Sequence, residues 1–179
     1  IVARGDKTFR FENDPDFLMG FTYSFEGKSH TIENMMSDME TLGLIVVHKG
    51  VVVYENYRKG SSPRSHFTSY SLVKSLVSTL IGFAIKDGVI YSVNDELEFY
   101  LPEVVNTGYA GVTIKQALQM SSGIQFDDPL EGEADDTVSW GLNAIILNNI
   151  SAFEAAAAFP RTSPPGTVFN YNTAEPQIL

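Results

Sequence analysis

A serine and a lysine stand one helical turn apart at the start of an apolar stretch. They belong to the segment Ser71-Leu72-Val73-Lys74. Residues three apart share one face of a helix, so the hydroxyl and the amine can meet. A serine hydroxyl is a weak nucleophile until a nearby base takes its proton. The spacing therefore predicts a nucleophile, Ser71, with Lys74 as its base.

The start of a helix would help both groups. Lysine accepts a proton only when it is neutral, and burial together with the positive end of the helix dipole disfavours the ammonium form. Backbone N–H groups at the same helix start can donate to a developing oxyanion. The four residues also fit a capping serine followed by a solvated lysine. Both interpretations stay open on this segment alone.

The sequence offers few residues for other kinds of catalysis. It has no cysteine and no Gly-x-Ser-x-Gly, His-Glu-x-x-His, Walker or Gly-x-Gly-x-x-Gly motif, and its histidines, His30, His48 and His66, fall in unrelated loop or turn settings. The acidic stretch 127–137 lacks the oxygen spacing of a calcium-binding loop, and we interpret it as a solvated loop. A Ser-His-Asp triad and a zinc site are therefore not expected.

The charge balance narrows the range of partners. The 179 residues carry 12 Lys or Arg against 22 Asp or Glu, a net charge of −10. Such a surface repels nucleic-acid phosphates and anionic membranes, so neither is an expected partner. No apolar run reaches the roughly 18 residues that suggest a membrane span, and the N-terminus has no signal-peptide core. A cytoplasmic and an exported protein both fit this composition, and the oligomeric state stays open.

Alternation and periodicity predict two main elements before residue 90. Strands at 44–47 and 51–57 form a β-hairpin around the turn His48-Lys49-Gly50, and the apolar first strand is expected to be buried on both faces. A helix follows over 71–86, and its apolar positions predict a place in a hydrophobic core. Residues 1–40 show no clear period.

Further helices are expected later in the sequence. Thr113 and Gln116 form a capping-box pattern, which opens a helix that ends before Gly123. Helical stretches follow around Trp140 and over 153–159. Pro176 suits the first turn of a helix, so we expect another helix to start there and the protein to continue beyond it.

The segment around Ser71 resembles the active-site helix of the serine β-lactamase and penicillin-binding-protein superfamily. The likeness is closest to its class C-like esterase and 6-aminohexanoate-dimer hydrolase branch, and it runs in consistent order through residues 42–179. Its further segments are Lys86-Asp87-Gly88-Val89-Ile90, Tyr100-Leu101-Pro102-Glu103, Thr113-Ile114-Lys115-Gln116-Ala117-Leu118, Met120-Ser121-Ser122-Gly123-Ile124 and Pro164-Pro165-Gly166-Thr167-Val168-Phe169-Asn170-Tyr171.

The resemblance implies a mixed α/β fold of the α+β type, with an antiparallel sheet flanked by helices and a mostly helical subdomain. Residues 1–179 would form the N-terminal part of a single domain, without its C-terminal strands. Residues 42–90 would supply the sheet hairpin and the active-site helix, 91–170 the largely helical subdomain, and 171–179 the second motif and the start of the next helix. In this family a later strand carries the third motif and the second oxyanion donor.

The second motif of the family falls on Tyr171-Asn172-Thr173. By resemblance, Tyr171 would relay protons between the nucleophile and the leaving group. Thr173 takes the position where β-lactamases usually carry asparagine, and it would contact the substrate. Trp140 is a candidate for lining the substrate entrance, with core packing as the alternative.

The resemblance implies a serine hydrolase that cleaves a small-molecule ester or amide through a Ser71 acyl-enzyme, without a metal or organic cofactor. Thr173 in place of asparagine favours the esterase or amidase branch. A true β-lactamase or D-amino-acid peptidase on the same residues is one alternative. A non-catalytic penicillin-recognising or sensor domain is an alternative of another class.

Overall fold

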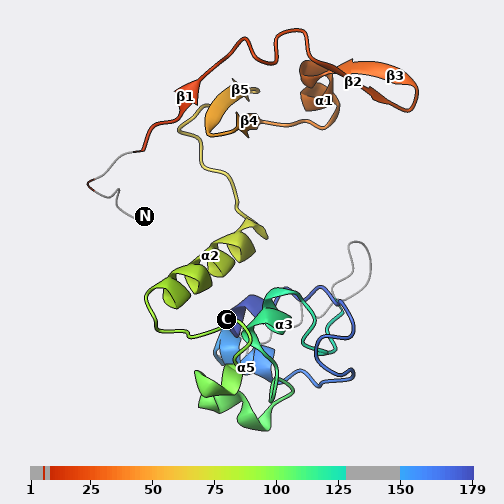
Figure 1. The fold of residues 1–179 in the computed structure, drawn as a ribbon. Helices are drawn as coiled ribbons and strands as arrows, with labels where there is room; N and C mark the ends of the chain where they lie inside the picture. Colours follow the sequence, from red (N-terminus) through yellow and green to blue (C-terminus); the bar gives the residue numbers. More distant parts are fainter. Residues whose placement is uncertain (1–5, 7–8, 128–149) are drawn as a thin grey trace. The chain divides into compact units, whose positions relative to one another are not determined.

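The computed structural model describes residues 6, 9–127 and 150–179, and it divides into two compact units (Figure 1). The first unit spans Ile1–Thr68 and the second spans Ser69–Leu179. Strands occur in the first unit, whereas the described residues of the second form helices and loops apart from isolated bridges. The fold is therefore of the mixed α/β class, as the sequence predicts.

The predicted hairpin is confirmed in the first unit. Strand β4 (Gly43–His48) pairs antiparallel with β5 (Val51–Tyr57), and β1 (Glu12–Asn13) adds to β5 in parallel. Lys49 and Gly50 both have positive φ, 49° and 82°. A two-residue turn with left-handed positions matches the right-handed twist of the strands that it joins.

A second hairpin and a helix come from the region without a clear period. Strand β2 (Thr22–Phe25) pairs antiparallel with β3 (Lys28–Thr31) around Glu26 and Gly27, both with positive φ. Helix α1 (Ile32–Asp38) follows directly. Its first turn is closed by a capping box between Thr31 and Asn34, which satisfies two backbone donors that the helix start leaves without partners.

The first unit by itself does not bury both faces of the first strand of the hairpin, and its burial on both faces stays a prediction. Ile45 and Val47 of β4 are 51% and 46% exposed, whereas Val53 of β5 is 2% exposed. An apolar run shows that a strand has hydrophobic faces, but it does not show which other element covers them.

The second unit begins with α2 (Leu72–Lys86), which confirms the predicted helix to within one residue. Ser71 is its N-cap, and Gly88, with φ of 74°, follows its C-cap Asp87. A glycine in the left-handed region ends helices readily because it lacks a Cβ.

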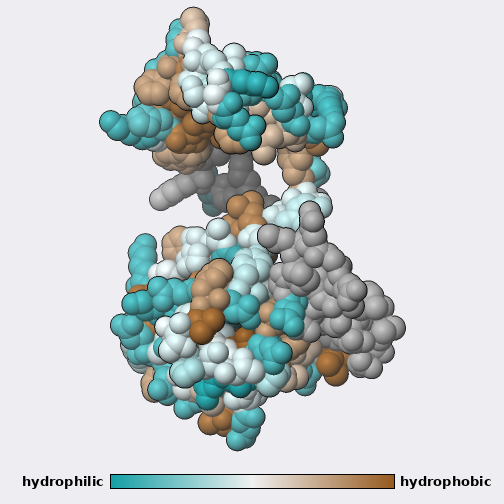
Figure 2. Space-filling view, turned by 90° about the vertical axis from the view of Figure 1, so that its right-hand side faces the viewer, coloured by the Kyte–Doolittle hydropathy of each residue, from teal (hydrophilic) through white to brown (hydrophobic). Residues whose placement is uncertain are grey.

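Within the second unit, one narrow side of α2 lies in the hydrophobic core, as the sequence predicts. Ile81 is 8% exposed and joins the hydrophobic core, and Ala84 and Ile85 pack against that core. The wider apolar stripe of the helix is more than 45% exposed, at Leu72, Val73, Leu76, Leu80 and Phe83. Apolar residues reach the surface at several places in the space-filling view (Figure 2). Periodicity predicted the apolar stripe of the helix, and the second unit alone covers only its Ile81 side.

The remaining helices of the second unit are short. They are η1 (Leu97–Phe99), η2 (Pro102–Asn106), α3 (Ile114–Leu118), α5 (Ala152–Ala157) and η4 (Glu175–Gln177). The predicted capping box between Thr113 and Gln116 opens α3. Pro176 lies in the first turn of η4. Helix η4 packs against both α3 and α5, which brings the last described residues against the middle of the unit (Figure 1).

A single hydrophobic core ties these helices together. Its buried members come from both described stretches of the unit: Ile81, Ile90, Leu97, Val104, Tyr109, Val112, Ile114, Ala117, Ile124, Phe126, Ala156, Ala157, Ala174 and Ile178. Ala174 and Ile178 lie just after the second motif of the sequence. Burial of these two side chains therefore fixes the motif to the rest of the unit.

A tight turn at Gly123 places the chain beside the segment that leads to Tyr171. Gly123 has φ of 83°, and a Cβ there would collide with the Ser163 carbonyl group. Its own carbonyl accepts from the N–H groups of Thr162 and Ser163 at 2.9 and 3.2 Å. Only glycine allows both the left-handed backbone and this close approach.

None of the helices in the described part of the chain combines the length and the apolar character needed to cross a membrane. The predicted helical stretch around Trp140 and most of the acidic stretch 127–137 lie outside the described residues.

Candidate active site

Ser71 occupies the N-cap position of α2, but its hydroxyl does not cap the helix. Tyr70, directly before it, has φ of 43°, and a left-handed backbone at a residue with a Cβ is strained. Within the described part of the chain, the Ser71 N–H donates to no backbone carbonyl. Both the hydroxyl and the N–H of Ser71 are thus available for other partners at the helix start.

The Ser71 hydroxyl contacts the two other polar groups of the predicted site. The Lys74 amine donates to the Ser71 Oγ at 3.1 Å, which is the predicted contact across one turn. The Tyr171 hydroxyl lies 2.6 Å from the same oxygen, although Tyr171 is 100 residues further along the chain. Three side chains predicted from motifs therefore meet at one oxygen atom.

Lys74 also lies against the ring of Tyr171. Its Nζ is 4.8 Å from the ring centroid, so the amine lies over the aromatic face. Lys74 is half-buried, and it borders a cavity of about 230 Å³ with Val77 and Leu118. The amine is thus held by two contacts, the Ser71 hydroxyl and the Tyr171 ring.

The residue before Tyr171 is anchored to the turn around Gly123. The Asn170 N–H donates to the Met120 carbonyl at 2.8 Å. Its side-chain amide donates to the carbonyls of Ile124 and Phe126 at 3.2 and 2.9 Å. These three bonds fix the backbone direction into Tyr171.

The residue after Tyr171 is anchored by a different device. The Asn172 side chain is 1% exposed, and its Oδ1 accepts from the N–H groups of Ala174 and Glu175 at 2.8 and 3.1 Å. A side chain that bonds its own backbone two residues on forms an Asx turn, which reverses the chain locally. Tyr171, 37% exposed, is therefore presented from between two fixed asparagines.

A buried polar cluster lies behind this turn. The Asn172 Nδ2, the Tyr109 hydroxyl and both carboxyl oxygens of Glu175 are buried and have no well-formed hydrogen bond to any described residue. Burial raises the pKa of Glu175 to about 7, although the nearby Ser122 hydroxyl favours its charged form. Burial, reinforced by Glu175, also raises the pKa of Tyr109 well above its ordinary value.

Sequence reasoning missed the residues that hold Tyr171, namely Asn170, Asn172 and Glu175. One signal was present, because Asn172 is followed three residues later by Glu175, a spacing that marks the start of a helical turn. The burial of the glutamate could not be read from this spacing. It follows from the packing of η4 on α3 and α5.

The roles predicted for Thr173 and Trp140 stay predictions, as do the catalytic roles of the three residues that meet at the Ser71 Oγ. Thr173 is half-buried directly after Asn172, and its contact with a substrate stays a prediction. Trp140 lies outside the described residues. Among the described residues, no group of three or more His, Asp or Glu is arranged to hold a metal ion.

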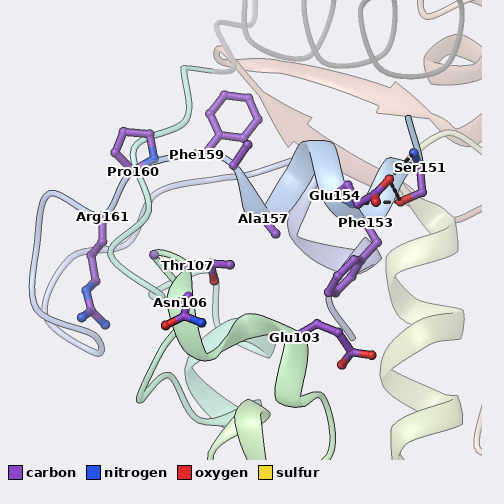
Figure 3. Close-up of a pocket in the computed structure, with 12 residues that line it drawn as sticks. Glu103, Asn106, Thr107, Ser151, Phe153, Glu154, Ala157, Phe159, Pro160 and Arg161 are labelled. Atoms are coloured by element: carbon purple, nitrogen blue, oxygen red, sulfur yellow. Dashed lines mark hydrogen bonds between the residues drawn. The ribbon is translucent and has the colours of Figure 1, made fainter. Parts of the chain in front are cut away.

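A cavity of about 710 Å³ lies away from this site, between η2, α5 and the segment that follows α5. Phe153 and Glu103 project toward it from α5 and η2, and Glu154 bonds back to Ser151 at the start of α5 (Figure 3). Neither Ser71 nor Tyr171 is among its lining residues. The polar contacts, rather than the cavity volume, identify the candidate site.

Two solved structures have a fold similar to that of this chain. A structure named "Putative 6-aminohexanoate-dimer hydrolase from Bacillus anthracis" matches 97% of this chain and 47% of its own length, with a TM-score of 0.77 and 21% identity. A structure named "Crystal structure of putative beta-lactamase from Bacteroides dorei DSM 17855" matches 82% of this chain and 42% of its own, with a TM-score of 0.60 and 19% identity. At this level of identity the likeness concerns the fold.

Sequence comparison adds the family. A 6-aminohexanoate-dimer hydrolase from Paenarthrobacter ureafaciens is 29% identical over 97 residues, which cover 54% of this chain and 24% of that protein. The chain thus matches less than half the length of each of these relatives. The family described as Beta-lactamase matches residues 29–177, which include Ser71, Lys74 and Tyr171. The chain therefore belongs to the β-lactamase family.

Proposed function

We propose that the protein is a serine hydrolase that transfers the acyl group of an ester or amide to Ser71 and then to water. One observation carries the proposal: the Lys74 amine and the Tyr171 hydroxyl both lie within hydrogen-bond distance of the Ser71 Oγ, at 3.1 and 2.6 Å. A nucleophile needs a base within such a distance, and this one has two candidates.

In the first step the Ser71 Oγ attacks the substrate carbonyl carbon and a C–O bond forms. The hydroxyl proton passes to the neutral Lys74 amine, with Tyr171 as the relay, and the carbonyl oxygen becomes an oxyanion. The Ser71 N–H at the start of α2 is one donor for this oxyanion, since this N–H donates to no described backbone carbonyl. The C–N or C–O bond to the leaving group then breaks, and Tyr171 delivers the proton that the leaving group requires.

In the second step water attacks the carbonyl carbon of the acyl-enzyme. Its proton passes to Lys74, again with Tyr171 as the relay. The Ser71 Oγ leaves as the acid product forms, and it regains its proton from Tyr171 or Lys74. No cofactor takes part in either step. The net reaction consumes one water and yields a carboxylic acid with an alcohol or an amine.

Small esters and linear amides are the proposed substrates. The 6-aminohexanoate-dimer hydrolases named above support a linear amide, and Thr173 in the usual asparagine position weakens the case for rapid β-lactam turnover. A true β-lactamase or D-amino-acid peptidase uses the same three side chains and differs in substrate alone. No nucleic acid or membrane partner is proposed, given the net charge of −10.

Hydrolysis of a p-nitrophenyl ester by the full-length protein tests the proposal. We expect Ser71→Ala to lower kcat/KM by about 10³-fold or more. Thr79→Ala is the matched control, since this hydroxyl is exposed on the same helix, bonds to the Ser75 carbonyl and lies outside the cavity that Lys74 borders. Equal turnover by wild type and Ser71→Ala would contradict the proposal.

Parallel assays separate the alternatives. Nitrocefin, a D-alanyl dipeptide and a linear p-nitroanilide are offered to the same preparations. Faster turnover of nitrocefin or of the dipeptide than of the ester and the anilide would favour the β-lactamase or peptidase reaction. Binding of a β-lactam without turnover of any substrate would favour a sensor domain.

A further inference from the structure

Glu175 is a fully buried acid that the proposed reaction does not use. Its side chain is 0% exposed, and neither carboxyl oxygen has a well-formed hydrogen bond to a described residue. An ionised carboxylate without partners is costly in a protein interior, whereas a neutral carboxyl group is much less so. The position therefore suits the neutral form.

Glu175 lies within one turn of the Asx turn that follows Tyr171. Its backbone N–H donates to the Asn172 Oδ1 at 3.1 Å, next to the bond from Ala174 at 2.8 Å. The Asn172 amide nitrogen and the Tyr109 hydroxyl belong to the same buried cluster. A charge that appears on Glu175 therefore acts directly on the turn that fixes Tyr171.

Few other charges face Glu175. Helix η4 packs against α3 and α5, whose charged residues Lys115 and Glu154 are both exposed. Within the described part of the chain, Tyr109 is the ionisable group beside Glu175, and burial keeps its hydroxyl protonated. Ser122 contributes a hydroxyl near the Glu175 carboxyl group. Lys74 of α2 borders a cavity together with Pro176, and its amine contacts the Ser71 hydroxyl and the Tyr171 ring. Among the described residues, no cation forms a hydrogen bond or ion pair with the Glu175 carboxyl group.

We propose that Glu175 is a positioning residue: its neutral carboxyl group completes the buried cluster behind Asn172, and its ionisation displaces Tyr171 from the Ser71 hydroxyl. The inference rests on the proposed function, since ionisation of Glu175 would set the pH above which the activity of the Ser71 site falls. Burial raises the pKa of Glu175 to about 7, so this limit falls near neutral pH. The site is then active with Glu175 protonated.

The rate at which a fluorophosphonate labels the full-length protein, measured across the pH range, tests this inference. Wild type is compared with Glu175→Gln, because glutamine mimics the neutral acid and does not ionise. Glu103→Gln is the matched control, since it removes an exposed carboxyl group of the same unit outside the candidate site. Urea unfolding of each variant at each pH shows that the labelled protein is folded.

Relative to Glu175→Gln, we expect the wild-type labelling rate to fall about tenfold for each pH unit above the pKa of Glu175, because the competent fraction falls by that factor. Glu103→Gln should follow the wild type. Parallel wild-type and Glu175→Gln profiles would overturn the inference, even if Glu175→Gln were less stable at every pH. A purely structural role changes stability without changing the shape of the profile.

A second measurement does not depend on catalysis. The ring resonances of isotope-labelled tyrosine, with Tyr171 assigned through Tyr171→Phe, are followed by NMR across the pH range around 7. We expect the Tyr171 resonance to shift with pH in wild type and to stay constant in Glu175→Gln. A resonance that shifts equally in both would overturn the inference. Absence of labelling at every pH, with the expected NMR result, would overturn the proposed function and leave the positioning role standing.

Discussion

The two sides of the candidate site are held by different kinds of structure. Ser71 and Lys74 face one another across one turn of α2, and their contact follows from helix geometry alone. Tyr171 is held between Asn170 and Asn172, whose side chains bond to backbone groups on both sides of the motif. The nucleophile and its base form a local structure, whereas the tyrosine depends on the tertiary fold. Substitutions on the two sides should therefore differ in kind.

Asn172→Ala should have the largest effect on stability. It leaves two backbone donors without their acceptor in a buried place, at a cost of about 3 kcal/mol in the free energy of unfolding. Urea denaturation measures this cost. Asn94→Ala, at an exposed asparagine of the same unit, should change it by about 0.5 kcal/mol or less. Similar costs for both substitutions would mean that Asn172 does not anchor the Tyr171 segment.

Ile81→Ala should have the next largest effect and lower the free energy of unfolding by about 2 to 3 kcal/mol. Ile81 is the buried member of α2 in the hydrophobic core, and it is 8% exposed. Loss of its side chain weakens the attachment of the helix that carries Ser71 and Lys74. The same denaturation experiment measures the effect. A cost below about 1 kcal/mol would show that other contacts hold α2.

The pH dependence of stability should report Glu175. Its pKa is raised from 4.5 to about 7 by burial, so between these values the folded chain holds a proton that the unfolded chain has released. The corresponding stability is complete below 4.5 and is lost as the pH rises through about 7, by an amount of order 3 kcal/mol. Urea unfolding of wild type should lose this stability and Glu175→Gln should not. Identical curves would contradict the assignment.

The smallest effect should be that of Ser71→Ala on stability. An N-cap serine usually contributes about 1 kcal/mol through a bond to the first turn, but the Ser71 hydroxyl makes no such bond. We expect a change within about 0.5 kcal/mol. Thr113→Ala removes a cap that does bond to its helix, and it should cost about 1 kcal/mol. A comparable loss for Ser71→Ala would make Ser71 a structural cap.

The contact between Ser71 and Lys74 could be predicted from the sequence, and so could the helix and the hairpin nearest to them in the chain. The 71–86 helix and the 44–57 hairpin have strong periods, and the structure places them within one residue of the expected bounds. The Ser71–Lys74 contact followed from spacing. The place of Tyr171, 100 residues away from Ser71, came only from the family resemblance, because no local rule links residues so far apart.

The rest depended on tertiary packing. The β2–β3 hairpin lacks an apolar period, and its turn at Glu26 and Gly27 was the only local signal. The burial of Glu175 in particular is set by the packing of η4 on α3 and α5. A sequence shows which residues are apolar or charged, but the partner that covers each of them is set by elements distant in the chain.

The most direct test of the central claim is peptide mapping, by mass spectrometry, of the full-length protein after treatment with a fluorophosphonate. We predict a single adduct on the peptide that contains Ser71. In both Lys74→Ala and Tyr171→Phe, the labelling rate should be lower by about 10²-fold or more. An adduct on another residue, or labelling of Ser71 at an unchanged rate in both variants, would contradict the central claim.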